Sequence, residues 1–365
     1  MIRASREITA AAVLNRASGT FNHFQAISRS MLEMSQRTEI SALTSLRGVA
    51  ALTVLIFHVV PDFRGYLAVD LFFLLSGFVL THVYHEIELT RQSYFNFLKA
   101  RLARIYPVHL MMLVVLLPML NTRPDFSFGG LLSSLLLMQS PWHSICWNYA
   151  SWSISAEWHS YLLFPILVIN YRTRSNNVLL ATLAVCAGIV GLTGLILGSG
   201  NISNTIVVLL RCLPEFISGI VMYFLLERGC LPKWISLDIT FCLSAAMLLL
   251  FELIHVPDGL MVCILGMILV TSATNQGRSV AILNCHVFAY LGYISYSLYM
   301  VQMAVWAVLM STFQISTSSI LYKVLFVSLC FLSAAIISPT IEYPARNWLK
   351  RVSWRPYLRS LATRN

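Results

Sequence analysis

Residues 42–61 read ALTSLRGVAALTVLIFHVVP, and this stretch decides the fold. It is long and apolar enough to span a bilayer as a helix, because about 20 residues cover the hydrocarbon core. It also carries Arg47 and His58. An ionisable group at membrane depth is costly, so it usually faces a protein interior and has a function there. The stretch therefore predicts a transmembrane helix with a polar stripe.

Arg47 and His58 are eleven residues apart, which at about 100° per residue places both on one helix face. They lie roughly 16 Å apart along the axis, at about 1.5 Å per residue. A cation near one membrane surface and an imidazole deeper in the bundle suit a long anionic ligand held at its charged end. Alternatively, Arg47 snorkels to the headgroups and His58 is a satisfied polar residue between helices. This stretch alone does not separate the two interpretations.

The composition is that of a membrane protein. Of the 365 residues, 58% are hydrophobic and 11% are charged, and the mean hydropathy is +0.74. A soluble domain does not bury that much apolar surface. The net charge of +10 reflects Lys and Arg in loops of the kind that face the cytoplasm, so we expect no nucleic-acid partner. The eight cysteines are scattered singly without metal-site spacing, so we expect no metal.

Ten apolar stretches predict an all-α fold, a polytopic integral membrane bundle of about ten transmembrane helices. They lie at 42–61, 66–84, 104–121, 152–171, 178–198, 205–226, 235–254, 259–274, 287–311 and 320–342. A further stretch, 128–140, is short for a span and carries two glycines near its start. Whether it is a re-entrant segment or a span stays open.

Loop charges orient the bundle. If the arginine-bearing N-terminus is inside, the lysines and arginines of the later loops also fall inside, as the positive-inside rule requires. Counting 128–140 as a span would place most of these charges outside. We therefore expect a cytoplasmic tail at 1–40, a transmembrane domain at 41–345 and a basic cytoplasmic tail at 346–365.

Two carboxylates stand in the predicted spans. Asp70 lies near the outer end of 66–84, close in depth to His58, where it would fix the imidazole tautomer and raise its basicity. Its alternative role is helix capping. Glu157 begins the span at 152–171 among tryptophans, where a charged carboxylate is costly unless it is paired or functional. The tryptophans suit an interfacial belt or a sugar-binding face. Ser76 and Gly77 are expected to be packing residues.

Arg101 and Arg104 stand at i and i+3 near the predicted cytoplasmic mouth. Guanidinium forks suit phosphates, so these two residues and Arg47 predict an anion-binding ring. The alternative is ordinary positive-inside charge. Arg211 and Glu215, at i and i+4, are expected to pair with each other and serve structure.

Seven segments together resemble the membrane-bound acyltransferase-3 family, bacterial enzymes that O-acylate surface carbohydrates and related molecules. They are, in family order, LTSLRGVAALTVLIFH, VDLFFLLSGFVL, RLARIYP, SWSISAEWHSYLLFP, RCLPEFISGIVM, YLGYISYSLYMVQ and IEYPARNWL. The resemblance implies about ten transmembrane helices, in agreement with the count above. It also implies that 41–345 is the acyltransferase domain and that the protein lies in the bacterial inner membrane, both termini cytoplasmic.

The resemblance implies that His58 is the catalytic histidine and Arg47 its motif partner. Arg101 and Arg104 fall on the family's R-x-x-R motif, which is associated with the acyl-CoA donor, and Glu157 falls on the family's glutamate. The chain departs from the family at two positions. Gln302 stands where many members have a histidine, and Trp158 stands where many have a polar or acidic residue.

The expected reaction transfers an acyl group, acetyl in the family's commonest case, from acyl-CoA to a hydroxyl of a carbohydrate or lipid-linked glycan. His58, oriented by Asp70, would take the hydroxyl proton, with Glu157 on the acceptor side. Direct transfer and an acyl-histidine both stay open, as do the acceptor, the acyl chain length and the oligomeric state. The alternative is a transporter or flippase of lipid-linked sugar without acyl transfer. The intact Arg47 and His58 pair argues against a third possibility, an inactive relative used for sensing or assembly.

Overall fold

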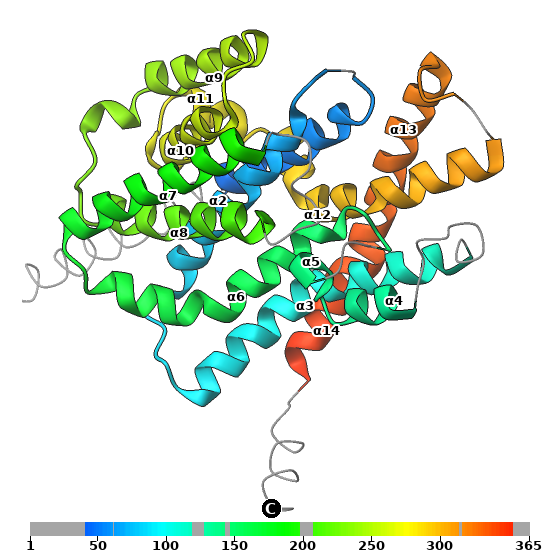
Figure 1. The fold of residues 1–365 in the computed structure, drawn as a ribbon, viewed down its shortest axis with the longest axis horizontal. Helices are drawn as coiled ribbons and strands as arrows, with labels where there is room; N and C mark the ends of the chain where they lie inside the picture. The colour runs from blue at the N-terminus through cyan, green and yellow to red at the C-terminus, as the bar shows by residue number, and fades with distance from the viewer. Residues whose placement is uncertain are drawn as a thin grey trace, which may run out of the picture.

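The computed structural model describes residues 41–60, 62–118, 128–142, 147–197, 207–313 and 316–352, and every regular element within these ranges is a helix (Figure 1). The elements are a first helix, Ser41–Phe57, then η1 Gly65–Leu67, α2 Ala68–Tyr84, α3 Arg91–Leu116, α4 Phe128–Leu135, α5 Gln139–Trp142, α6 Ser151–Arg172, α7 Asn176–Leu197, α8 Val207–Glu227, η4 Lys233–Ser236, α9 Asp238–Leu253, α10 Asp258–Thr274, α11 Arg278–Leu283, α12 His286–Val308, the π-helix η5 Leu309–Phe313, α13 Ile320–Ile337, the π-helix η6 Ser338–Glu342 and α14 Tyr343–Arg351. The predicted all-α fold is confirmed.

Several helices are long and apolar enough to cross a membrane. Among the described residues five segments meet that standard, at Gly65–Tyr84, Asn176–Ile196, Val208–Glu227, His286–Ser311 and Ile320–Arg351. Two shorter apolar helices, Ser41–Phe57 and Asp258–Thr274, accompany them. The α2 and α8 windows are both 72% buried, whereas the α7 window is 22% buried. The protein is a helical membrane protein with α2 and α8 at its centre and α7 at its periphery.

Glycines bring the central helices into backbone contact. A Cβ added at Gly77 of α2 would lie 2.0 Å from the carbonyl oxygen of Phe216 on α8, and one added at Gly219 would lie 2.2 Å from that of Leu74. Gly48 of the first helix meets Gly292 of α12 in the same way. Small residues allow transmembrane helices to approach this closely. The packing role predicted for Gly77 agrees with this contact.

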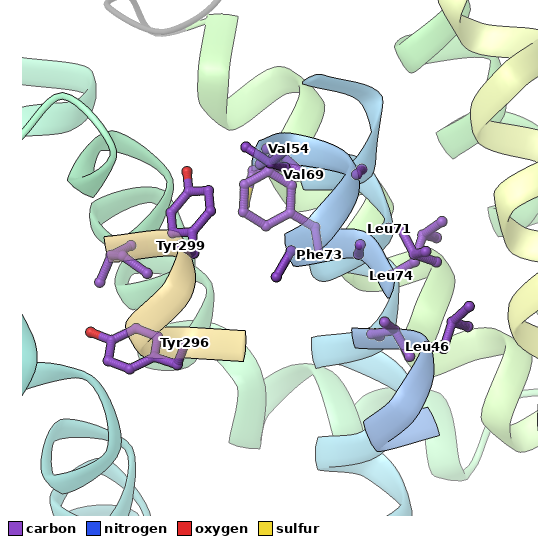
Figure 2. Close-up of a cluster of buried hydrophobic side chains, with 14 of the residues drawn as sticks. Leu46, Val54, Val69, Leu71, Phe73, Leu74, Tyr296 and Tyr299 are labelled. Carbon is purple, nitrogen blue, oxygen red and sulfur yellow. The ribbon is translucent and has the colours of Figure 1, made fainter. Parts of the chain in front are cut away.

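The first helix, α2 and α12 share one buried apolar cluster (Figure 2). Leu46 and Val54 come from the first helix, Leu74 from α2, and Tyr296 and Tyr299 from α12. The two tyrosines add hydroxyl groups to a surface that is otherwise apolar. The polar side chains of these three helices are therefore held in a rigid apolar frame.

The segment at 128–140 is not a span. Helix α4 has eight residues and is therefore about 12 Å long, far short of the hydrocarbon thickness. Two side chains of α3 hold it: the Tyr106 hydroxyl donates to the Leu135 carbonyl at 3.1 Å, and His109 Nε2 lies 2.8 Å from the Ser134 carbonyl. The segment is docked against α3.

The C-terminal boundary expected after residue 345 falls inside α14, which runs from Tyr343 to Arg351. Pro344 suits the first turn of a helix, because the amide it lacks has no partner there. At the other end Lys99 of α3 donates to the carbonyls of Lys350 and Val352. The first residues of the expected basic tail therefore continue the helical structure. The tail expected at 1–40 lies outside the described residues.

Candidate active site

Arg47, Arg101 and Arg104 meet in one charged cluster. Arg104, Arg101 and Glu157 are close enough to Arg47 to act on its charge. Arg47 comes from the first helix, whereas Arg101 and Arg104 stand one turn apart on α3. The structure thus brings together the three arginines that the sequence placed at one depth. Their binding of a donor stays a prediction.

The three guanidinium groups differ in their partners. Arg104 forms an ion pair with Glu342 and lies over the Tyr296 ring, 5.2 Å from its centroid. Arg101 donates to the Tyr84 hydroxyl at 3.3 Å, but its buried Nε has no hydrogen-bond partner. Arg47 makes no hydrogen bond or ion pair with any residue that the structure describes. Two guanidiniums without a carboxylate partner make a ready anion-binding site.

Glu157 is anchored beside the arginines. The Ser76 hydroxyl of α2 donates to Glu157 Oε1 of α6 at 2.5 Å, and the Tyr161 hydroxyl lies 3.4 Å from the same serine oxygen. Ser76, expected only to pack, instead holds a carboxylate. Because Glu157 also acts on Arg47, it belongs to the arginine cluster.

His58 lies at the opposite end of the first helix. The last helical residue is Phe57, and the His58 amide donates to the Leu55 carbonyl at 3.3 Å. The imidazole is exposed, with the rings of Phe57 and Phe326 at centroid distances of 5.1 and 6.3 Å. Within the described part of the chain neither ring nitrogen has a hydrogen-bond partner. Among the described residues, no side chain competes with a substrate for either nitrogen.

The predicted pairing of Asp70 with His58 is wrong in this structure. Asp70 instead accepts two hydrogen bonds from Arg211, from Nε at 2.7 Å and from Nη2 at 2.6 Å. The close α2–α8 contact brings this guanidinium to the carboxylate, and the bidentate pair is the stronger interaction. Arg211 also lies 3.6 Å from Glu215, its predicted partner, but both Glu215 carboxyl oxygens are buried without a hydrogen bond.

The Arg211 pair is part of a larger ionic network. Arg211 Nη1 lies 3.3 Å from Asp258 of α10, and Asp258 accepts a hydrogen bond from Tyr66 at 3.1 Å. Arg64, in the segment that follows His58, pairs with Glu252 at 3.1 Å and donates to the carbonyls of Phe251 and Val256. The network fixes the segment after His58 to the connection between α9 and α10. Asp70 thus has no direct contact with His58, and it affects the position of His58 only by stabilising this network.

Sequence reasoning missed Glu342. It accepts from Arg104 and, at 2.7 Å, from the Ser297 hydroxyl of α12. The sequence did contain a sign of this role, because Glu342 is a carboxylate at the end of an apolar stretch, like Asp70 and Glu157.

Two positions depart from the family pattern. Buried Gln302 donates to the Leu298 carbonyl of its own helix at 3.2 Å, and Trp158 is half-buried. In the described ranges no group of three or more His, Cys, Asp or Glu is arranged to hold a metal.

The described residues thus form a helical membrane bundle that carries an arginine cluster between the first helix and α3, with His58 just after the end of the first helix. A family model described as "Acyltransferase domain" matches residues 40–339. Since this is most of the chain, the protein belongs to that family. The resemblance carried by the seven sequence segments is confirmed.

Two relatives are similar over part of the chain. The acyltransferase MdmB of Streptomyces mycarofaciens is 34% identical over 151 residues, which cover 34% of this chain and 38% of that protein. "Protein 2 in picA locus" of Rhizobium radiobacter is 35% identical over 153 residues, which cover 35% of this chain and 77% of that protein. The match thus spans well under half of MdmB. No solved structure matches the chain.

Proposed function

We propose that this acyltransferase moves an acyl group, most simply acetyl, from acyl-CoA to a hydroxyl of a carbohydrate or lipid-linked glycan, as an O-acyltransferase of the bacterial inner membrane. One observation carries the proposal: Arg47 lies in the first half of the helix Ser41–Phe57, His58 follows directly after its last residue, and among the described residues neither side chain has a hydrogen-bond or ion-pair partner. They are roughly 16 Å apart at the rise of an α-helix. This separation suits a donor with phosphates at one end and a thioester at the other.

The arginine cluster supports an anionic donor. Arg47 and Arg101 offer guanidinium forks that no carboxylate of the described residues pairs with, and such forks bind phosphate oxygens in pairs. Arg104, held by Glu342, supplies a third positive charge in a fixed place. Glu157, held by Ser76, adds a negative charge near Arg47 without forming an ion pair with it. The same end of the bundle carries the basic face of α14, which supports a cytoplasmic location by the positive-inside rule.

The chemistry at the other end is assigned to His58. Its neutral imidazole takes the proton from the acceptor hydroxyl as that oxygen attacks the thioester carbon. The carbon–sulfur bond then breaks, and the imidazolium returns the proton to the sulfur, which gives the ester and free CoA. General base catalysis of this kind contributes about 10²–10⁴ in rate. Asp70 serves as a positioning residue through Arg211.

The acceptor is assigned from family resemblance and from aromatic residues. The sequence resembles enzymes that acylate surface carbohydrates, and Trp152 and Trp158 lie half-buried on α6, the helix that carries Glu157. Aromatic faces of this kind bind sugar rings.

A labelling experiment tests this assignment. The purified protein in lipid nanodiscs receives acetyl-CoA labelled in the acetyl group, with lipid-linked glycan or polysaccharide from its own host. Label in the glycan that mild base releases as acetate supports O-acylation of carbohydrate. Label only in another hydroxyl compound would contradict the carbohydrate acceptor, and glycan crossing the bilayer without acquiring label would point to a transporter instead.

A further inference from the structure

Helix α14 places two more cations beside the arginine cluster. Glu342, Arg346 and Lys350 follow each other at intervals of four residues, and residues at this spacing share one helix face. Glu342 begins this row and forms the ion pair with Arg104 of α3. The row therefore starts at the arginine cluster and continues along α14.

The direction of α14 places these cations at the outer edge of the cluster. Glu342 contacts Arg104, whereas the Lys350 carbonyl accepts from Lys99, which lies five residues earlier on α3. The two helices are therefore antiparallel, and α14 runs toward the start of α3. Arg346, between the two contacts, lies farther from the His58 end than Arg104 does.

Both cations interact with the arginines already assigned to the donor. Among charged groups, Arg104 acts most strongly on Arg346, and Arg101 also contributes. Lys350 is acted on by Arg346, Arg101 and Arg104. These effects connect α14 and α3 into one cluster of positive charge.

The cluster has an excess of positive charge that no described carboxylate neutralises. The Arg346 guanidinium lies 6.0 Å from the Tyr343 ring centroid, and within the described ranges neither it nor Lys350 has a carboxylate partner. The cluster holds five cations and two carboxylates; these are Arg47, Arg101, Arg104, Arg346, Lys350, Glu157 and Glu342. Like charges at this density repel one another, so the arrangement favours a polyanionic ligand.

We propose that Arg346 and Lys350 bind the 3′-phosphate of the CoA donor, while Arg47, Arg101 and Arg104 hold its diphosphate. The inference rests on the proposed function. The diphosphate lies between the thioester arm and the ribose, so the 3′-phosphate is the phosphate farthest from the reacting carbon. A phosphate monoester carries close to two negative charges and suits an arginine fork with a lysine beside it. Arg346 is thereby a specificity-determining residue for the donor.

The test compares two donors in nanodiscs of uncharged phosphatidylcholine. Acetyl-CoA and acetyl-3′-dephospho-CoA are each titrated against wild type, Arg346→Gln, Arg346→Lys and the control Arg278→Gln. Arg278 is exposed at the start of α11, and Arg278→Gln removes the same positive charge as Arg346→Gln. We expect Arg346→Gln to raise KM for acetyl-CoA about tenfold, since hydrogen bonds between charged groups are worth about that factor. KM for the dephospho donor and kcat should stay at wild-type values, with Arg346→Lys intermediate and Arg278→Gln unchanged.

The outcomes separate this inference from the proposed function. If Arg346→Gln raises KM equally for both donors, or for neither, the 3′-phosphate assignment is overturned while acyl transfer stands. If Arg346→Gln changes KM only after anionic lipid is added, and equally for both donors, Arg346 binds a lipid headgroup and the assignment is again overturned. If wild type transfers acetyl from neither donor, the proposed function itself fails. A melting temperature equal to that of wild type ensures that Arg346→Gln is compared as a folded protein.

Discussion

Arg211 donates hydrogen bonds from three nitrogens to two carboxylates. Nε and Nη2 donate to Asp70, and Nη1 donates to Asp258 at 3.3 Å. Glu215 is as deeply buried, yet its carboxyl oxygens accept no hydrogen bond. The stabilising part of this network is therefore the guanidinium and the two carboxylates it serves.

We predict that Arg211→Gln destabilises the protein by about 3–5 kcal/mol, because it leaves Asp70 and Asp258 buried without a positive partner. Glu215→Gln, the matched control, should cost less than Arg211→Gln, because it removes only the longer 3.6 Å ion-pair contact with Arg211 and no hydrogen bond. Thermal unfolding in detergent measures both. Equal losses for the two variants would show that Glu215 is an essential member of the network.

The pairing of Asp70 with Arg211 predicts how Asp70→Asn affects the pH profile. In the proposed mechanism, protonation of His58 at low pH lowers kcat/KM, since a protonated imidazole is not a general base. Because Asp70 makes no contact with His58, Asp70→Asn should lower stability but leave the midpoint of this acid limb unchanged. A midpoint moved to lower pH would contradict the account, because a carboxylate beside His58 would favour its protonated form.

At the scale of elements, the α2–α8 contact depends on glycine. Gly77→Ala places a methyl group 2.0 Å from the Phe216 carbonyl oxygen, so the two helices must separate. We predict a loss of about 1–3 kcal/mol, typical of overpacking, with reduced activity because Arg211 withdraws from Asp70. Thermal unfolding and an acyl-transfer assay measure the two effects.

Gly188→Ala in α7 is the matched control, because no atom lies within 4 Å of the Cβ it would add. It should be neutral or stabilising by up to about 1 kcal/mol, since alanine favours a helix. If Gly77→Ala behaved like this control, the close contact between α2 and α8 would contribute nothing to stability.

Most elements follow from apolar length alone. Each of the ten predicted stretches coincides with a helix, with most ends shifted by a few residues. The exception is α3, which was expected to begin at 104 and begins at Arg91. Its first half carries Arg91, Lys99 and Arg101, so hydropathy does not detect it. A local signal was available in Thr90, whose hydroxyl accepts from the Ser93 amide as an N-cap.

At the scale of the whole molecule, the predictable part of the site is the part that local geometry determines. Arg47 lies in the first helix and His58 follows directly after its last residue, whereas Arg101 and Arg104 share α3, so helical spacing places each pair approximately. The partners of Asp70 and Glu157 come from other helices, and the sequence does not contain the packing that selects them. Asp70 pairs with Arg211 and not with His58, and Glu157 accepts a hydrogen bond from Ser76, which was not predicted.

The central claim is that His58 carries acyl transfer from a donor held by the arginine cluster. The most direct measurement is the release of free CoA from acetyl-CoA by purified wild type and His58→Ala, with and without host glycan. The account predicts release by wild type that depends on the glycan, and at least a hundredfold loss in His58→Ala at an unchanged melting temperature, the lower bound of about 10² for general base catalysis. Glycan-dependent release at equal rates from both proteins would contradict it.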